Sequence, residues 1–408
     1  MKTKLILILC ILSILLTCLC GCYDAHSIEN LAYATAIGLD VSEDNILSLT
    51  LQFSIPSSSS DSGSSQSSKA DSITVQCTSI NSGISLINNH ISNEVNLSHC
   101  KVIVISEELA EQGLADYVDT LANNIEIRPD CSVVISRGSA KHFIESAPPS
   151  VENLIVRYYQ VALNSTEYTG YTPSITLTDF ISYIKNSFIQ GHAILGGVNT
   201  GNNSTSENGT YSGLDSDYKA GETPISSSDS TVETFGTAVF YDDKLIGELN
   251  GIETVCHLLV TNDLTSCTIS IPDPFNINSS IDLHITKKKD CKVFVEFING
   301  SPYISIDVFI DAFGLSLDEE TNYQSLEDIH ILTAYAEQYI KLQVNNYLYK
   351  TSKELNSDIS GSGKYALSKY LTWDEWLESN WLENYKNSFF DVNVTVRLKS
   401  GYEFNKSP

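Results

Sequence analysis

Basic residues are scarce in this chain of 408 residues. It has 24 Lys and Arg against 50 Asp and Glu, a net charge of −26, and no run of Lys and Arg longer than three residues. Proteins that bind nucleic acid, or that adhere to anionic lipid through charge, need clusters of basic side chains. The composition therefore excludes a nucleic-acid function, and it gives the surface no electrostatic affinity for a membrane.

Catalytic and metal-binding spacings are also missing. The eight histidines contain no His-x-x-x-His pair of the zinc hydrolase kind. Ser85 lacks the second Gly of a nucleophile elbow, and residues 215–222 lack the terminal Glu of a calcium loop, although their carboxylates leave a weak cation site as an alternative. In "DISGSGKY", Asp358 and Tyr365 replace the Gly and the Ser or Thr of a phosphate loop. These absences predict a non-enzymatic protein with no metal and no cofactor.

The cysteines lack the close, repeated spacing of a disulfide scaffold. Beyond residue 22 they stand alone, at positions 77, 100, 131, 256, 267 and 291. Cys100 and Cys131 each open an apolar, strand-like run, where a free Cys packs as a small apolar side chain. We therefore favour unpaired structural cysteines, with up to three disulfides in an oxidising exterior as the alternative.

The start of the chain has the three parts of a secretory signal. Lys2 and Lys4 precede an apolar run, residues 5–16, that is too short to span a bilayer. The following Leu19-Cys20-Gly21-Cys22 resembles the bacterial lipobox. We therefore predict a lipoprotein signal peptide over residues 1–21 and lipidation of Cys22. An ordinary cleaved signal and an uncleaved anchor are the alternatives, and all three predict export.

Lipidation of Cys22 would supply the membrane affinity that the charge does not. A diacylglyceryl thioether carries two acyl chains, with an N-acyl chain such as palmitate in addition, and two chains hold a protein stably where one does not. Loss of residues 1–21 would remove Lys2 and Lys4 and no acid, which leaves a net charge of −28. The mature protein would then depend on covalent lipid to stay at the membrane.

Residues 22–146 have the pattern of an α/β domain. Two β-rich runs, residues 31–39 and 46–55, flank the polar "DVSEDN" and predict a hairpin. Strand-like and helix-like segments then alternate, which predicts a βαβαβα unit with strands covered on both faces. The strand-like runs are 72–77, 100–106 and 131–136. Between them and the hairpin, the Ser-rich residues 57–72 predict a flexible loop.

Residues 147–230 predict a middle domain that ends in a polar tract. Helical patterns lead to a strand at 191–198, and Thr178 before Asp179 looks like a helix N-cap. The tract 199–230 is rich in Gly, Ser, Asn and Asp, which predicts a domain linker or a long surface loop.

Residues 231–408 predict an α+β domain with a mainly antiparallel sheet. Hairpins are expected to turn at Asp242-Asp243 and at Asn299-Gly300. One long helix is expected over 325–356, and Thr372 with Glu375 forms a capping box that starts another. Alternation in two segments predicts half-buried strands, the last of them antiparallel. The alternating apolar positions are 304, 306, 308 and 310, and 390, 392, 394, 396 and 398.

Two tryptophans open the capped helix. Trp373 and Trp376 are three residues apart, hence on one face, and such a pair most often lies in the core. The alternative is that they are exposed anchors for a partner.

Four blocks resemble the Ger(x)C family of spore germination lipoproteins. They follow one another in the family's order over almost the whole mature chain. They are "CYDAHSIENLAYATAIGLD" with Ala36, Ile37, Gly38, Leu39 and Asp40, the segment 97–140, "GTAVFYDDKLIGELNGIET" with Gly236, Ala238, Phe240, Asp243, Lys244, Leu245 and Gly247, and "NSDISGSGKY" with Asp358, Gly361 and Gly363.

The resemblance implies a non-enzymatic lipoprotein subunit of a spore nutrient germinant receptor. Such a subunit would be needed for receptor assembly and germination signalling in sporulating bacteria. It would lie on the outer face of the spore inner membrane, with A-type and B-type membrane subunits as partners. The resemblance also implies three mixed α/β domains, in agreement with boundaries near 147 and 230. The alternative is a solute-binding lipoprotein of a membrane transporter, because the lipobox and the βαβ-like first half also suit that class.

Overall fold

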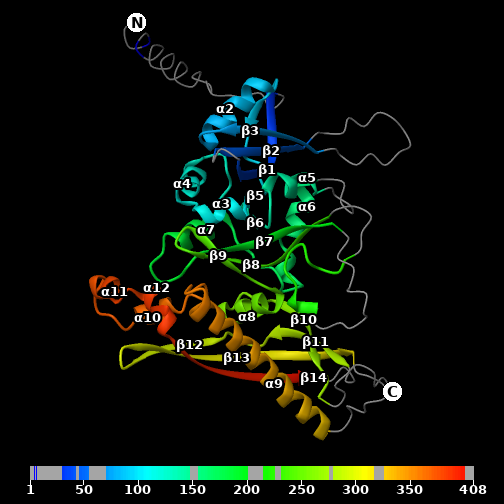
Figure 1. Ribbon diagram of the computed structural model, residues 1–408, viewed down its shortest axis with the longest axis vertical. Coiled ribbons are helices and arrows are strands. Elements are labelled where there is room, and N and C mark those ends of the chain that lie inside the picture. Colours follow the sequence, from blue (N-terminus) through cyan, green and yellow to red (C-terminus); the bar gives the residue numbers. More distant parts are fainter. Residues whose placement is uncertain are drawn as a thin grey trace.

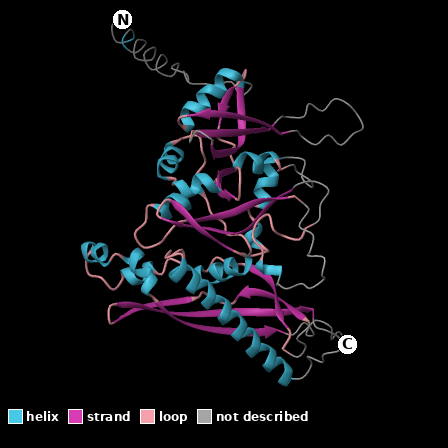
Figure 2. Ribbon diagram, viewed as in Figure 1, coloured by secondary structure: helices cyan, strands magenta, loops and turns pink. Residues whose placement is uncertain are grey.

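The computed structural model of the chain contains two β-sheets, one above the other in the view of Figures 1 and 2. It describes residues 30–42, 46–54, 70–147, 155–200, 215–225, 231–274, 279–316 and 326–399, together with Lys4 and Ile6. Helices and strands occur in similar amounts, so the predicted α+β class is confirmed. No helix in the described part is long and apolar enough to cross a membrane.

The first sheet has nine strands and is mixed. The strands across it are β3 (Ala70–Cys77), β2 (Leu47–Ser54), β1 (Leu31–Val41), β5 (Val102–Ser106), β6 (Ser132–Ser136), β7 (His192–Asn199), β8 (Thr231–Tyr241) and β9 (Lys244–Leu249), and the short β4 (Glu94–Asn96) also pairs with β1. The predicted hairpin is present as β1 and β2, and β1, β5, β6 and β7 run parallel.

The predicted βαβαβα unit is correct for β5 and β6 and wrong for its first strand. β3 pairs antiparallel with β2 and not with β5, so it extends the hairpin of β1 and β2 at the edge of the sheet. An alternating or apolar run has the same pattern in either orientation, so the sequence alone did not distinguish them.

Helices cover both faces of this sheet. One face carries α2 (Ile80–His90), α3 (Glu107–Gln112), α4 (Ala115–Asn123) and α7 (Leu177–Ile184), and the other carries α5 (Ala140–Glu145) and α6 (Ile155–Ala162). α7 begins two residues earlier than predicted. Its N-cap is Thr176, whose hydroxyl accepts the N–H of Asp179, so the expected cap at Thr178 is wrong.

The first sheet extends across both predicted domain boundaries. β7 pairs antiparallel with β8, so residues 231–249, which we assigned to the C-terminal domain, continue the sheet of the N-terminal domain. Part of the polar tract also packs onto it, because Ala220 is buried and its N–H donates to the carbonyl of Phe235. The rest of that tract, residues 201–214 and 226–230, and residues 57–69 of the Ser-rich run lie outside the described residues. The three-domain division stays a prediction.

The second sheet has five strands: β10 (Ser266–Pro272), β11 (Ser280–Lys287), β12 (Lys292–Ile298), β13 (Ser301–Ser316) and β14 (Phe389–Lys399). The turn at Asn299-Gly300 is confirmed, with both residues at positive φ. β13 alternates as predicted, with Ile304, Ile306 and Val308 buried. β14, however, runs parallel to β13, so the antiparallel prediction is wrong. The long helix between the two strands carries the chain back across the sheet.

Helices lie between the two sheets and cover one face of the second sheet. They are α8 (Gly251–Thr261), α9 (Leu326–Tyr349) with a π-helical turn (Lys350–Glu354), α10 (Gly363–Leu367), α11 (Trp373–Ser379) and α12 (Trp381–Asn384), with 3-10 turns at Ser165–Glu167, Asp215–Asp217 and Tyr385–Asn387. The long helix and its apolar stripe are confirmed, with Leu332, Ala336 and Ile340 buried. Val239 and Leu249 of the first sheet belong to the same core, so the two sheets share it.

Candidate functional site: joints between distant segments

The predicted lipid site, Cys22, lies outside the described residues, so its lipidation stays a prediction. The candidate functional residues within the described part are those of the family blocks.

The first block joins β1 to α5. Asp40, at the end of β1, is buried, and its carboxylate accepts the N–H groups of Ala140 at 2.7 Å and Lys141 at 2.9 Å, in the first turn of α5. A carboxylate is favourable at a helix N-terminus, where N–H groups have no partner within the helix. A Cβ at Gly38 would lie 2.8 Å from Cδ1 of Ile144, so glycine permits the close approach of α5. The block holds this helix on the sheet.

The hairpin block joins β8 and β9 to α4. In the turn between the strands, the Asp243 carboxylate accepts the N–H of Ala115 at 3.0 Å, and its backbone carbonyl accepts the N–H of Leu114 at 3.0 Å. Within β8, Gly236 has φ of +100°, and a Cβ there would lie 2.4 Å from the carbonyl oxygen of Leu249. Only glycine fits this backbone without displacement.

The fourth block encloses a buried carboxylate. The Asp358 side chain is fully buried and accepts N–H groups from Ser362 at 3.1 Å, from Gly363 at 2.9 Å and from the Trp381 indole at 2.8 Å. Burial raises the pKa of Asp358, and the donors from Trp381, Gly363 and Ser362 partly oppose that shift. The position resembling a phosphate loop thus already binds an anion, which is the protein's own carboxylate.

The same loop docks onto the first sheet. The N–H of Gln190, just before β7, donates to the carbonyl of Asp358 at 3.0 Å. The hydroxyl of Ser357 donates to the carbonyl of Phe240 in β8 at 2.6 Å. The loop belongs to the second half of the chain in sequence, and these two hydrogen bonds attach it to the first sheet.

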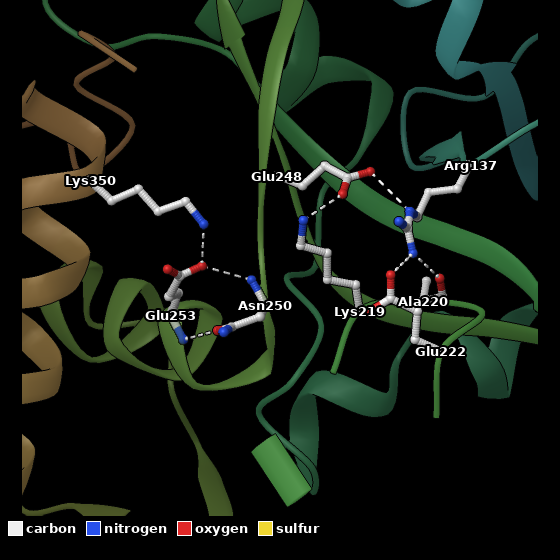
Figure 3. A network of polar contacts seen from close by, with 8 residues as sticks. All are labelled: Arg137, Lys219, Ala220, Glu222, Glu248, Asn250, Glu253 and Lys350. Carbon is white, nitrogen blue, oxygen red and sulfur yellow. Dashed lines mark hydrogen bonds and ion pairs between the residues drawn. The ribbon is translucent and has the colours of Figure 1, made fainter. Parts of the chain in front are cut away.

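A polar network strengthens this region (Figure 3). Arg137, at the end of β6, lies 3.2 Å from the carboxylate of Glu248 in β9 and donates to Glu222 at 2.6 Å and to the Ala220 carbonyl at 3.0 Å. Lys219 donates to the other oxygen of Glu248 at 2.9 Å. These contacts fix residues 219–222, within the predicted linker, against the sheet.

The network has a counterpart on the other side of β9. Glu253 completes the capping box of α8 with Asn250, and its carboxylate also accepts the ammonium of Lys350 at 2.7 Å (Figure 3). Lys350 follows directly on α9, so this ion pair connects the two helices that lie between the sheets.

Two buried histidines are in contact where helices α8 and α9 pack on the first sheet. Nε2 of His257, in α8, lies 3.3 Å from Nε2 of His192, in β7, and its Nδ1 lies 2.9 Å from the hydroxyl of Tyr347, in α9. Burial lowers the pKa of His192 to about 4. It also lowers the pKa of His257 well below its usual value, and the neighbouring His192 adds to that shift. Both rings are therefore neutral at pH 7.

No motif predicted this contact, because His192 and His257 are 65 positions apart. The signal available was the apolar setting "VCHLLV" around His257, which indicates burial. The prediction that both tryptophans of the pair lie in the core is half correct, because Trp376 is buried and Trp373 is 54% exposed.

The remaining sequence candidates have structural roles. The Ser85 hydroxyl donates to the carbonyl of Asn81 within α2. All six cysteines of the described part are free and buried, with Sγ of Cys100 and Cys131 3.6 Å apart. Within the described ranges, no three His, Cys, Asp or Glu side chains are grouped so that they could hold a metal ion.

Two hollows lie on the first sheet. One of about 440 Å³ lies where β1 and β5 end, lined by Asp40, Ser106 and the glutamates of α3. The other, about 770 Å³, is a groove between α2 and α4, lined by Asn88, Asn123 and their neighbours. Asp40 of the first block lines the smaller hollow, and neither hollow is lined by Asp243 or Asp358.

Both halves of the chain match models of one protein family. Residues 24–198 match the model described as the spore germination protein N-terminal domain, and residues 235–401 match the one described as spore germination B3/GerAC like, C-terminal.

Full-length relatives and one solved structure agree with this match. The chain is 21% identical to the putative spore germination protein YfkR of Bacillus subtilis (strain 168), with 98% of this chain and 96% of YfkR covered. It is also 21% identical to spore germination protein KC of the same organism, with 93% and 91% covered. The crystal structure of the GerBC protein matches with a TM-score of 0.52 and 17% identity over 91% of this chain and 99% of that one, which supports the fold. The chain belongs to the GerAC family of spore germination proteins, as its four blocks predicted.

Proposed function

We propose that this protein is a lipid-anchored subunit of a spore nutrient germinant receptor, and that it acts in receptor assembly and signalling without catalysing a reaction. Its partners would be the A-type and B-type membrane subunits on the outer face of the spore inner membrane. Cys22 would carry the lipid. One observation carries the proposal: the family-block residues lie at joints between distant segments.

The joints support an architectural role because the aspartates of the family blocks bind backbone groups of the protein itself. The carboxylates of Asp40, Asp243 and Asp358 accept backbone N–H groups from a helix or loop elsewhere in the chain. A side chain bonded in this way is held by the fold and is not free to bind a substrate or transfer a proton. The family blocks therefore hold distant segments in a fixed arrangement. A subunit that docks onto partners needs such a fixed surface.

A pull-down from detergent-solubilised spore membranes, through a C-terminal tag, tests the proposal. We expect mass spectrometry to find A-type and B-type subunits, and a diacylated Cys22 at the N-terminus. A transporter permease and ATPase, or an unmodified N-terminus without partners, would contradict it.

Substitution of the lipid site gives an independent test. Cys22→Ala is expected to abolish receptor function or accumulation and to leave the folded body unchanged in circular dichroism. Cys20→Ala is the matched control, because it removes a neighbouring thiol and keeps the lipidated Cys. A fully active Cys22→Ala strain would count against the proposal.

A solute-binding role is the second candidate, and one observation favours it. The hollow of about 440 Å³ lies beyond the carboxyl ends of the parallel strands β1 and β5, where open α/β sheets bind ligands. The antiparallel pairs of the second sheet argue against the two parallel-sheet lobes of that class. Calorimetry on the detergent-purified protein would decide, since micromolar or tighter binding of a nutrient solute would revive this role.

A further inference from the structure

Helix α11 exposes an apolar stripe to solvent. Leu371 is 94% exposed, Trp373 54% and Leu377 51%. Trp373 and Leu377 are four residues apart and so lie on one face of the helix. Figure 1 shows α11 at the left edge of the molecule, beyond the end of the second sheet. We call the α11 patch the surface made by Trp373 and Leu377 of the helix together with Leu371, which lies two positions before its first residue.

A buried tryptophan of the same helix attaches the patch to the rest of the protein. Trp376, three residues after Trp373 in α11, is buried, and its indole N–H donates to the hydroxyl of Ser187 at 3.0 Å. Its ring lies 6.0 Å from that of Trp381 and 5.5 Å from that of Tyr370, centroid to centroid. A surface that is already ordered loses little conformational entropy when it binds, so exposed side chains presented in this way are suited to docking.

An acidic stripe lies beside the apolar one. Asp374 and Glu378 are exposed, each one position after an apolar residue of the stripe. Glu375 is occupied, because its carboxylate accepts the N–H of Leu371 at 2.9 Å as part of the helix cap. The segment 365–384 contains four acidic residues and a single Lys. The patch therefore combines apolar anchors with uncompensated negative charge.

The charge decides between possible occupants. Anionic lipid headgroups would be repelled by Asp374 and Glu378. A second copy related by twofold symmetry would place acid against acid. A helix with apolar residues on one face and Lys or Arg beside them matches both stripes.

We propose that the α11 patch binds a cationic amphipathic helix of a protein partner. Apolar side chains of that helix would pack on Trp373 and Leu377, and its Lys or Arg side chains would pair with Asp374 and Glu378. The inference rests on the proposed function only in expecting this partner within the membrane complex.

A photo-crosslinking experiment in spore membranes tests the inference. Benzoylphenylalanine is placed at position 371 of the full-length protein, and mass spectrometry identifies the crosslinked peptide. We expect a helical segment with Lys or Arg at three- and four-residue spacing among apolar residues. The same probe at position 342, which is 56% exposed on α9, is the matched control. Crosslinks to lipid, to a second copy or to an acidic segment, or none above the control, would overturn it.

The charge requirement is tested with a synthetic peptide of the crosslinked segment. We expect Asp374→Lys with Glu378→Lys to weaken binding of the full-length protein at least tenfold, and reversal of the peptide's basic residues to restore it. Trp373→Ala should weaken binding similarly without lowering the melting temperature, and Leu342→Ala should change neither. Equal binding by the charge-reversed protein would overturn the inference.

The two proposals fail separately. Recovery of the receptor subunits in the pull-down, with no specific crosslink at position 371, would leave the proposed function standing and refute the α11 patch. A crosslink to a basic helix in a protein outside any receptor would do the reverse.

Discussion

The two sheets differ in how they are enclosed. In the first, alternate side chains of β5 enter different cores: Ile103 packs under one layer of helices and Val104 under the other. In the second, the alternate residues of β13 are divided between core and surface, with Ile306 buried and Asp307 on an open face. The first sheet is thus a closed scaffold, and the second leaves one face and the α11 patch for contact with other molecules.

The largest expected effect comes from disconnecting the two regions. Asp358→Ala would leave the N–H groups of Ser362, Gly363 and Trp381 buried without an acceptor, at a cost of about 4 kcal/mol in the free energy of unfolding. Urea denaturation would measure it, with Asp307→Ala on the open face as a control that we expect to change little. A loss below about 1 kcal/mol would show that the loop is not a joint.

A matched pair of truncations tests the enclosure itself. Ile194→Ala, at a fully buried position of β7, is expected to cost about 3 kcal/mol because it leaves a cavity. Phe294→Ala removes a larger side chain from the open face of β12, where it is 59% exposed, and is expected to change stability by less than about 0.5 kcal/mol. Equal losses in thermal unfolding would mean that the second sheet is covered on both faces.

Acid should act on the joint through the two histidines. Their pKa values are lowered in the folded protein, so between about pH 6.5 and 4 the unfolded chain binds more protons than the folded one, and stability decreases as pH falls. For His192 alone the loss from pH 6.5 to pH 5 is about 2 kcal/mol. Urea unfolding of His192→Gln should show a weaker pH dependence in this window than the wild type, and the exposed His142→Gln should not. An unchanged slope in His192→Gln would contradict the buried, neutral state.

The smallest effect is expected at the polar network. Glu248→Gln weakens the contacts to Arg137 and Lys219, and we expect a loss of about 1 kcal/mol, because this carboxylate is mostly buried. Asp130→Asn removes the partner of Arg128 in an exposed pair and should cost nothing measurable. Comparison at low and high salt would show whether the first pair is shielded from solvent as the structure indicates.

Local signals predicted much of the fold. The hairpin at Asn299-Gly300, the capping box of Thr372 and Glu375, and the apolar stripe of α9 each depend on residues within a few positions of one another. Strand orientation and order depend on partners far away in the chain. For that reason the antiparallel β3, the parallel β14 and the pairing of β7 with β8 were not predicted.

The candidate site was likewise predicted only where it depends on neighbouring residues in the sequence. The family blocks were recognised in the sequence, but the groups that they bind were not, because Asp243 and Ala115 are 128 positions apart. Trp373 and Trp376 are alike in type and spacing, and only the packing of Trp376 on Ser187 and Trp381 decides which of them is buried.

The parallel pairing of β13 with β14 determines when the second sheet can be completed. Asp307 and Asn393 face each other across 86 positions, and α9 and α10–α12 lie between them. Contacts this far apart form late, since a long loop must close first. Until then β13 has an unpaired edge, which can capture a strand of another molecule. Pairing of β14 therefore closes an edge of β13 that is open in any chain that has folded without this strand.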